Sequence, residues 1–159
     1  MHANAELIQR FYTAFAAKDG EGMAACYHER VRFSDPVFPE LKGAEAGDMW
    51  RMLTSRAADL VIEASDITAD DTRGAAHWEA HYTFSATGRK VHNKIDASFR
   101  FQDGLIIEHV DTFDLYRWTR MALGATGLVL GWTPMVKNKV RGQARAQLDR
   151  FHEKRARGS

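Results

Sequence analysis

Hydrophobic residues follow a helical spacing in the first third of the chain. From about residue 4 to residue 18 they recur every three to four positions, which predicts an amphipathic helix that ends at Asp19 and Gly20. Similar but shorter patterns predict two more helices, over 23–28 and over about 44–55. Between these two, residues 31–35 alternate as a strand, and Pro36 and Pro39 then impose an irregular loop.

From Leu60 the period of the apolar positions changes to two. Strands are predicted at 60–69, 75–84, 90–101 and 105–113, with turns at 70–74, 85–88 and 102–104. Strands joined by such short connections must be antiparallel, because parallel neighbours need a long crossover. Helices followed by a meander indicate an α+β fold, in which the N-terminal helices cover one face of a curved antiparallel sheet.

The turn lengths predict how these strands pair. A four-residue loop over 85–88 pairs Phe84 with Arg89 and gives the sheet one polar face and one apolar face. The polar face carries three pairs of opposed residues: His77 with Asp96, Glu79 with Lys94, and His81 with His92. A three-residue loop over 102–104 pairs Phe101 with Leu105. Ile107, His109 and Asp111 then face the helix-covered interior, with Ala97 and Ile95 opposite His109 and Asp111.

The helical pattern returns after Asp114. A helix that ends at Gly124 is expected, followed by an apolar segment over 127–132, and Thr133 and Pro134 form the N-cap and first residue of a long last helix. This division gives a main domain at 1–116 and a C-terminal helical extension at 117–159. We expect the extension to pack on the same domain or on a second subunit.

Composition supports a single ordinary globular domain of 159 residues, with 45% hydrophobic and 27% charged residues. The net charge of +1 conceals a basic tail, since residues 134–159 contain eight Lys and Arg against two acidic residues. The tail lacks aromatic residues interleaved for base stacking, so we expect no nucleic acid, whereas weak contact with a membrane surface stays open. A lone Cys26 and no apolar run of about 20 residues favour the cytoplasm.

The candidate chemistry lies on the inward face of the last strand. Asp111 and His109 place a carboxylate and an imidazole side by side, and Asp35 ends the first strand, so these three are the candidate acid/base residues. Structural alternatives stand beside each assignment. Asp111 could be held by a backbone amide or by Asn93, His109 could be a core histidine bonded to Asp111, and Asp35 could be a turn residue.

The same interior contains side chains that could bind a ligand. Asn93 and Tyr82 would orient it by hydrogen bonds, and an apolar lining would come from Trp78, Phe113, Tyr12 and Trp50, all of which could equally be core residues. On the opposite face, His77, Glu79 and His81 could bind a divalent metal, but the predicted partners Lys94 and Asp96 explain their charges. We therefore expect no metal and no cofactor.

Two segments and the order of elements resemble a known superfamily. Phe33-Ser34-Asp35-Pro36-Val37 and the run from Glu108 to Asp114, within a helix–helix–strand–helix–meander order, resemble the nuclear-transport-factor-like superfamily. It includes ketosteroid isomerases, SnoaL-like polyketide cyclases and limonene epoxide hydrolases. The resemblance covers about residues 4–116 and implies a cone-shaped α+β fold. It also implies a homodimer formed through the outer face of the sheet.

The resemblance carries over to few individual residues. Asp35 falls where the isomerases keep their proton-shuttling base, and Asp111 falls where the cyclases and hydrolases have a catalytic aspartate. Phe11 and Ala97 occupy the positions of the isomerase hydrogen-bond donors, whereas Trp78 and Ala80 replace the arginine and second aspartate of the hydrolases.

Two functions are therefore expected from the sequence. The first is a cofactor-independent isomerase, cyclase or hydrolase that acts on a small, largely apolar carbonyl or epoxide compound. The alternative is a non-catalytic ligand-binding or dimeric interaction module of the same fold.

Overall fold

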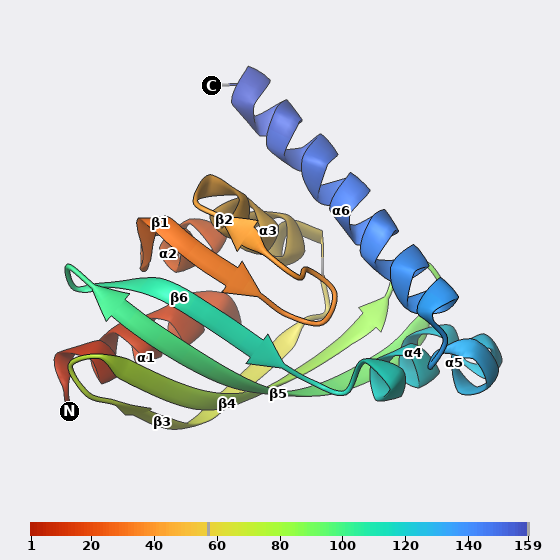
Figure 1. The fold of residues 1–159 in the computed structure, drawn as a ribbon, viewed down its shortest axis with the longest axis horizontal. Coiled ribbons are helices and arrows are strands. Elements are labelled where there is room, and N and C mark those ends of the chain that lie inside the picture. The colour runs from red at the N-terminus through yellow and green to blue at the C-terminus, as the bar shows by residue number, and fades with distance from the viewer. Residues whose placement is uncertain (57, 159) are drawn as a thin grey trace.

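A computed structural model describes residues 1–56 and 58–158 of the chain, which form one six-stranded sheet and six helices (Figure 1). The strands are β1 (Tyr27–Ser34), β2 (Leu41–Lys42), β3 (Val61–Ala69), β4 (Arg73–Phe84), β5 (Arg89–Gln102) and β6 (Leu105–Thr112), in the sheet order β2-β1-β6-β5-β4-β3. The helices are α1 (Ala3–Ala16), α2 (Gly20–Ala24), α3 (Ala44–Arg56), α4 (Leu115–Leu123), α5 (Ala125–Leu130) and α6 (Pro134–Arg157). Helices α1 and α3 pack against the curved sheet, which confirms the predicted α+β class.

The prediction of a helix over 23–28 is wrong. Helix α2 begins earlier, where the Asp19 side chain accepts a hydrogen bond from the backbone N–H of Gly22 at 2.9 Å. Tyr27 already belongs to β1, which runs parallel to β6 and pairs Tyr27 with Ile106. A six-residue window is too short to separate a helix from a strand by periodicity alone, so pairing with a distant strand decides the outcome. The two-residue strand β2, which pairs with β1, was also not predicted.

The predicted register between β4 and β5 is confirmed. Phe84 pairs with Arg89, His81 with His92 and Glu79 with Lys94. The apolar face of this hairpin is buried beneath α1 and α3, and the charged face is turned outward. Matched charges on one face and large apolar side chains on the other define this register, because a shift of one residue would expose every core side chain.

The predicted loop between β5 and β6 is wrong, yet His109 and Asp111 still face inward. Asp103 and Gly104 form a two-residue turn with φ of 55° and 74°, so Gln102 pairs with Leu105. That pairing alone would turn the inward residues of β6 outward, but a bulge at Ile107 adds one residue and restores the alternation. As a result His109 lies opposite Phe99 and Asp111 opposite Ala97, two positions from the predicted partners on the same face. Ile106, rather than Ile107, is the fully buried isoleucine.

Helix α6 packs across α3 of its own chain (Figure 1). Leu148 is completely buried in the main core, and the Asp48 carboxylate of α3 pairs with Arg51 at 2.8 Å and also with His152 of α6. Arg141 donates from Nε to the backbone oxygen of Pro36 at 2.8 Å, so α6 also holds the loop that follows β1. The division of the chain at 116 and 117 stays a prediction, and residue 159 of the extension lies outside the described residues.

No helix within residues 1–56 and 58–158 has the length and apolar character that a membrane span requires.

Candidate functional site

A chain of buried hydrogen bonds runs through the interior of the cone and ends at Asp111. The Trp50 indole N–H donates to the Tyr27 hydroxyl at 2.7 Å, and this hydroxyl lies 2.8 Å from His109 Nδ1. His109 Nε2 lies 2.8 Å from Asp111 Oδ1, which also accepts from the Trp78 indole N–H at 3.2 Å. Four elements therefore contribute to one network: β1 supplies Tyr27, α3 supplies Trp50, β6 supplies His109 and Asp111, and β4 supplies Trp78.

The donors and acceptors in this chain assign the tautomer of His109. Burial raises the pKa of Tyr27 well above its ordinary value, so the hydroxyl keeps its proton. Because this hydroxyl already accepts from Trp50, its own proton points to Nδ1 of His109. The imidazole then carries its proton on Nε2 and donates it to Asp111 Oδ1.

His109 is enclosed completely by aromatic side chains. It is 0% exposed, and five aromatic rings surround it, with centroid distances from 4.4 Å to 6.2 Å: Phe11, Tyr27, Phe33, Trp50 and Phe99. Both ring nitrogens are engaged, so the imidazole has no free donor or acceptor to offer to a ligand. Its geometry is that of a positioning residue, which fixes the orientation of the Asp111 carboxylate.

Two buried polar atoms of the described residues have no hydrogen-bond partner, and both belong to this site. They are Asp111 Oδ2 and the Tyr12 hydroxyl. The pKa of Tyr12 is raised well above its ordinary value, first by burial and then by the negative charge of Asp111, so the two groups share the same interior. A buried polar atom without a partner costs about 1–3 kcal/mol, and such atoms mark places where a ligand could supply the missing bond.

Asp35 lies at the start of the loop after β1, apart from the hydrogen-bonded chain. Its Oδ1 accepts from the backbone N–H groups of Val37 at 2.8 Å and Phe38 at 2.6 Å, which is the turn role considered from the sequence. Burial nevertheless raises its pKa from 3.8 to about 7, against those two hydrogen bonds and with a further contribution from the charge of Asp111. The charge of Asp111 therefore influences the pKa of Asp35, although no hydrogen bond joins the two carboxyl groups.

We expect the raised pKa of Asp35 to make the protein less stable as the pH rises from about 4 to about 7. The folded state holds the proton of Asp35 more tightly than the unfolded state does, so the stabilisation is complete below the unfolded pKa and is lost as the pH passes the folded value of about 7. A rise from 3.8 to about 7 corresponds to about 4 kcal/mol at full effect, and partial exposure of Asp35 reduces this to about 2 kcal/mol.

Asp35→Asn removes this titration while leaving an oxygen to accept from Val37 and Phe38. Urea unfolding of both proteins at several pH values tests the expectation. The wild-type protein should lose about 2 kcal/mol more than the variant between pH 4 and pH 7. Parallel pH profiles for the two proteins would contradict the assignment.

The structure divides the predicted ligand-binding residues into two groups. Tyr12, Trp50 and Trp78 surround the buried chain, and Trp78 has a role that the sequence did not indicate, as a donor to Asp111. Asn93 is buried on the same sheet face as Trp78, but it takes no part in the chain of hydrogen bonds that ends at Asp111.

The other two, Tyr82 and Phe113, are only partly buried. Both pack against a second apolar cluster beneath α4, which contains Trp118. Tyr82 accepts from the Trp118 indole at 2.8 Å and lines a cavity of about 360 Å³, whose wall also includes His81 and His92 but not Asp111.

Sequence reasoning missed Tyr27. The hydrophobic pattern predicts a helix over 23–28 that includes Tyr27, and the alternation of Val31 and Phe33 does not extend back to it, because Glu29 is exposed and the strand is irregular between Tyr27 and Arg32. Its bonds to Trp50 and His109 span 23 and 82 residues, and such long-range pairs leave no local signal.

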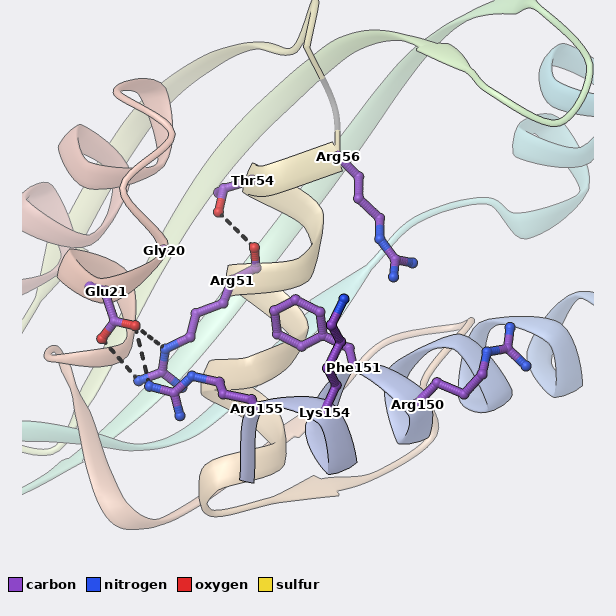
Figure 2. Close-up of a pocket in the computed structure, with 9 residues that line it drawn as sticks. All are labelled: Gly20, Glu21, Arg51, Thr54, Arg56, Arg150, Phe151, Lys154 and Arg155. Carbon is purple, nitrogen blue, oxygen red and sulfur yellow. Dashed lines mark hydrogen bonds and ion pairs between the residues drawn. The ribbon is translucent and has the colours of Figure 1, made fainter. Parts of the chain in front are cut away.

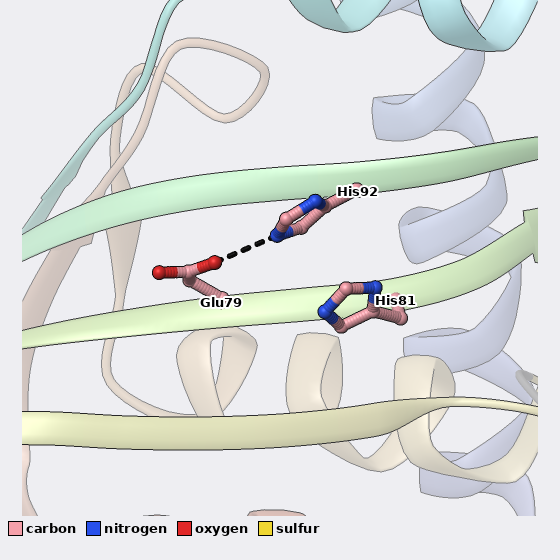
Figure 3. Close-up of side chains that lie close together, drawn as sticks. All are labelled: Glu79, His81 and His92. Carbon is pink, nitrogen blue, oxygen red and sulfur yellow. Dashed lines mark hydrogen bonds and ion pairs between the residues drawn. The ribbon is translucent and has the colours of Figure 1, made fainter.

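A second cluster lies on the outer face of the sheet, where Glu79, His81 and His92 gather within 4.8 Å (Figure 3). These three side chains offer the ligand types of a divalent metal site. Glu79 already accepts from His77 at 2.9 Å and from His92 at 2.7 Å, and these hydrogen bonds lower its pKa to about 2. The hydrogen bonds account for Glu79 without a metal, and a homodimer through this face stays a prediction.

Comparison with known proteins places the fold. Residues 8–109 match the family of SnoaL-like domains. The chain is 19% identical to an NTF2-like protein of unknown function from Burkholderia pseudomallei, with 76% of this chain and 98% of that chain aligned at a TM-score of 0.66. It is 26% identical to a putative polyketide cyclase from Silicibacter, over 74% of this chain and 93% of that chain, with a TM-score of 0.60.

A third solved structure is an LEH-like epoxide hydrolase from M. tuberculosis, 19% identical over 81% of this chain and 96% of that chain, with a TM-score of 0.62. No curated protein matches the chain by sequence. The matched family region contains the inward strand face up to His109 and the helices that cover it. The chain therefore belongs to the family of SnoaL-like domains, and its fold is that of the NTF2-like structure.

Proposed function

We propose that the protein binds a small, largely apolar molecule inside the cone and converts it without a cofactor, as an isomerase, cyclase or hydrolase. Asp111 is the acid/base group. The observation that carries this proposal is the difference between the two carboxylate oxygens: Oδ1 is held by His109 and Trp78, while Oδ2 is buried and has no partner in the described part of the chain. A base that is fixed on one oxygen and free on the other is oriented for proton transfer to or from a bound molecule.

Each neighbour of Asp111 then has a defined part. His109 and Trp78 hold the carboxylate in one orientation, and Tyr27 keeps His109 in the tautomer that donates to it. Tyr12 offers a free hydroxyl in the same interior as Asp111, and its part is to donate to a carbonyl or epoxide oxygen as negative charge develops there. Asp111 would take a proton from carbon or from water and return it to the same molecule, so the net reaction consumes no cofactor.

Ligand entry requires movement of side chains. The Asp111 side chain is 2% exposed, so a ligand reaches Oδ2 only when its covering shifts. Val37, Tyr82 and Phe113 are partly buried and pack between the main core and the α4 cluster, which makes them the candidate gate. The closed interior also favours the second candidate function, a non-catalytic ligand-binding module in which Asp111 and His109 satisfy each other.

A thermal-shift screen of apolar carbonyl compounds and epoxides tests the proposal, followed by product analysis of each stabilising compound. We expect at least one compound to raise the melting temperature and to be converted, and Tyr12→Phe to weaken its binding, because the free hydroxyl is lost. Compounds that bind through Tyr12 but remain unchanged would establish the binding module instead. Stabilisation that is indifferent to both Tyr12 and Asp111 would refute the site.

A further inference from the structure

A second cavity, of about 740 Å³, lies where α6 crosses α2 and α3, away from the cone interior (Figure 2). Its wall is strongly basic. Five of the nine lining residues are cationic and one is acidic: the wall consists of Gly20, Glu21, Arg51, Thr54, Arg56, Arg150, Phe151, Lys154 and Arg155. None of the residues proposed to bind or convert a ligand in the cone interior contributes to it.

The cations of this cavity divide into paired and unpaired groups. Arg51 donates to Glu21 at 2.7 Å and to Asp48 at 2.8 Å, and Arg155 lies 3.4 Å from Glu21 and 3.5 Å from Asp48. Arg56, Arg150 and Lys154 form no ion pair with any described residue. Two carboxylates thus pair with two arginines, and the three further positive charges around the same cavity have no counter-charge within residues 1–56 and 58–158.

An aromatic ring adds an apolar surface among these charges. Phe151 is half-buried against the core, and the Arg56 guanidinium lies over its ring with Cζ 6.0 Å from the centroid. Figure 2 shows Arg56 reaching from the end of α3 toward Phe151 and Lys154 on α6. The cavity therefore presents a flat apolar surface with positive groups from two helices beside it.

We propose that this cavity binds a phosphate-bearing molecule. Guanidinium groups match phosphate oxygens in pairs, and a lysine ammonium adds a point charge, so a bound phosphate would supply the missing counter-charge. The Phe151 ring would carry an apolar or aromatic part of the ligand. Arg150, Phe151, Lys154 and Arg155 lie outside the matched region at 8–109, so α6 adds this site to the family domain.

Isothermal titration of the full chain tests the proposal with inorganic pyrophosphate and with phenyl phosphate. Vesicles of phosphatidylcholine with and without phosphatidic acid separate a lipid source of the phosphate from a soluble one. The variant Arg150→Gln/Lys154→Gln should bind about tenfold or more weakly, because it removes two unpaired cations. Both residues are exposed and unpaired, so the variant should keep its fold.

Lys137→Gln/Lys139→Gln is the matched control. It removes the same charge from the same helix at positions that do not line the cavity, and we expect its affinity to change less than about twofold. Phosphate binding that only the cavity variant loses, in solution or on vesicles, supports the site. Equal weakening by both variants would reveal a general basic surface, and it would overturn the proposal, as would no binding of any probe.

Discussion

Asp111→Asn is expected to lower turnover about 10³-fold and to raise the free energy of unfolding by about 1 kcal/mol. The loss of activity follows because an amide cannot exchange a proton in the way a carboxylate does. The gain in stability follows because Asn keeps an oxygen for His109 and Trp78, while it removes a charge whose second oxygen is buried without a partner. If removal of the reactive group stabilises the fold, that group is kept in its position for function and not for stability.

Urea unfolding at neutral pH and turnover of a compound found by the screen measure the two effects. Asp114→Asn is the matched control, because Asp114 is exposed and caps α4 by accepting from the backbone N–H of Arg117 at 3.1 Å. Asn caps a helix about as well as Asp, so neither stability nor turnover should change much. A clear loss of stability in Asp111→Asn would show that the buried charge is compensated, which would contradict the assignment of Oδ2 as a free atom.

The sequence predicts the sheet better than the network inside it. The register of His81 with His92 could be predicted because charge pairs and core side chains agree along a whole hairpin. The inward direction of His109 was right although the loop was wrong, because the two-residue turn and the bulge at Ile107 have opposite effects on the alternation. Neither irregularity can be seen in the hydrophobic pattern, because the two together leave the alternation of inward and outward residues unchanged.

Side-chain partners were harder to predict than strand faces. The resemblance assigns Trp78 to the position of the hydrolase arginine, and the sequence gives Trp78 no role toward Asp111. In the structure the Trp78 indole N–H donates to Asp111, so an uncharged aromatic residue is a hydrogen-bond partner of this carboxylate. The arrangement depends on long-range packing of three aromatic side chains, Tyr12, Trp50 and Trp78, for which spacing along the chain gives no information.

The surface on which α6 packs also cannot be predicted from the spacing of residues along the chain. The sequence predicts a long last helix that packs on the same domain or on a second subunit, and in the structure Leu148 of this helix is fully buried. The partner could not be predicted, because it is defined by Asp48, which is 1% exposed on α3, forms ion pairs with Arg51 and Arg155, and is hydrogen-bonded to His152. A buried carboxylate needs such partners, but its burial is known only once the fold is known.

Tyr27→Phe is expected to lower the free energy of unfolding by about 2–4 kcal/mol. The Tyr27 hydroxyl serves two buried groups, the Trp50 indole N–H and His109 Nδ1, and phenylalanine leaves both without a partner. Each unsatisfied buried group costs about 1–3 kcal/mol, and the aromatic ring itself is retained, so the loss reports the hydrogen bonds. Turnover should fall as well, because His109 is no longer held in the tautomer that donates to Asp111.

Tyr12→Phe provides the comparison within the same core. Tyr12 and Tyr27 are both buried, at 2% and 8% exposure, and Phe11 contacts both rings, but the Tyr12 hydroxyl has no partner. Its removal should leave the free energy of unfolding unchanged or raise it by about 1 kcal/mol, since no bond is lost and a buried polar atom disappears. Chemical unfolding of the two variants under one condition therefore separates a structural hydroxyl from one that is free for a ligand. Equal destabilisation by Tyr12→Phe and Tyr27→Phe would contradict the assignment of the Tyr27 hydroxyl as bonded and of the Tyr12 hydroxyl as free.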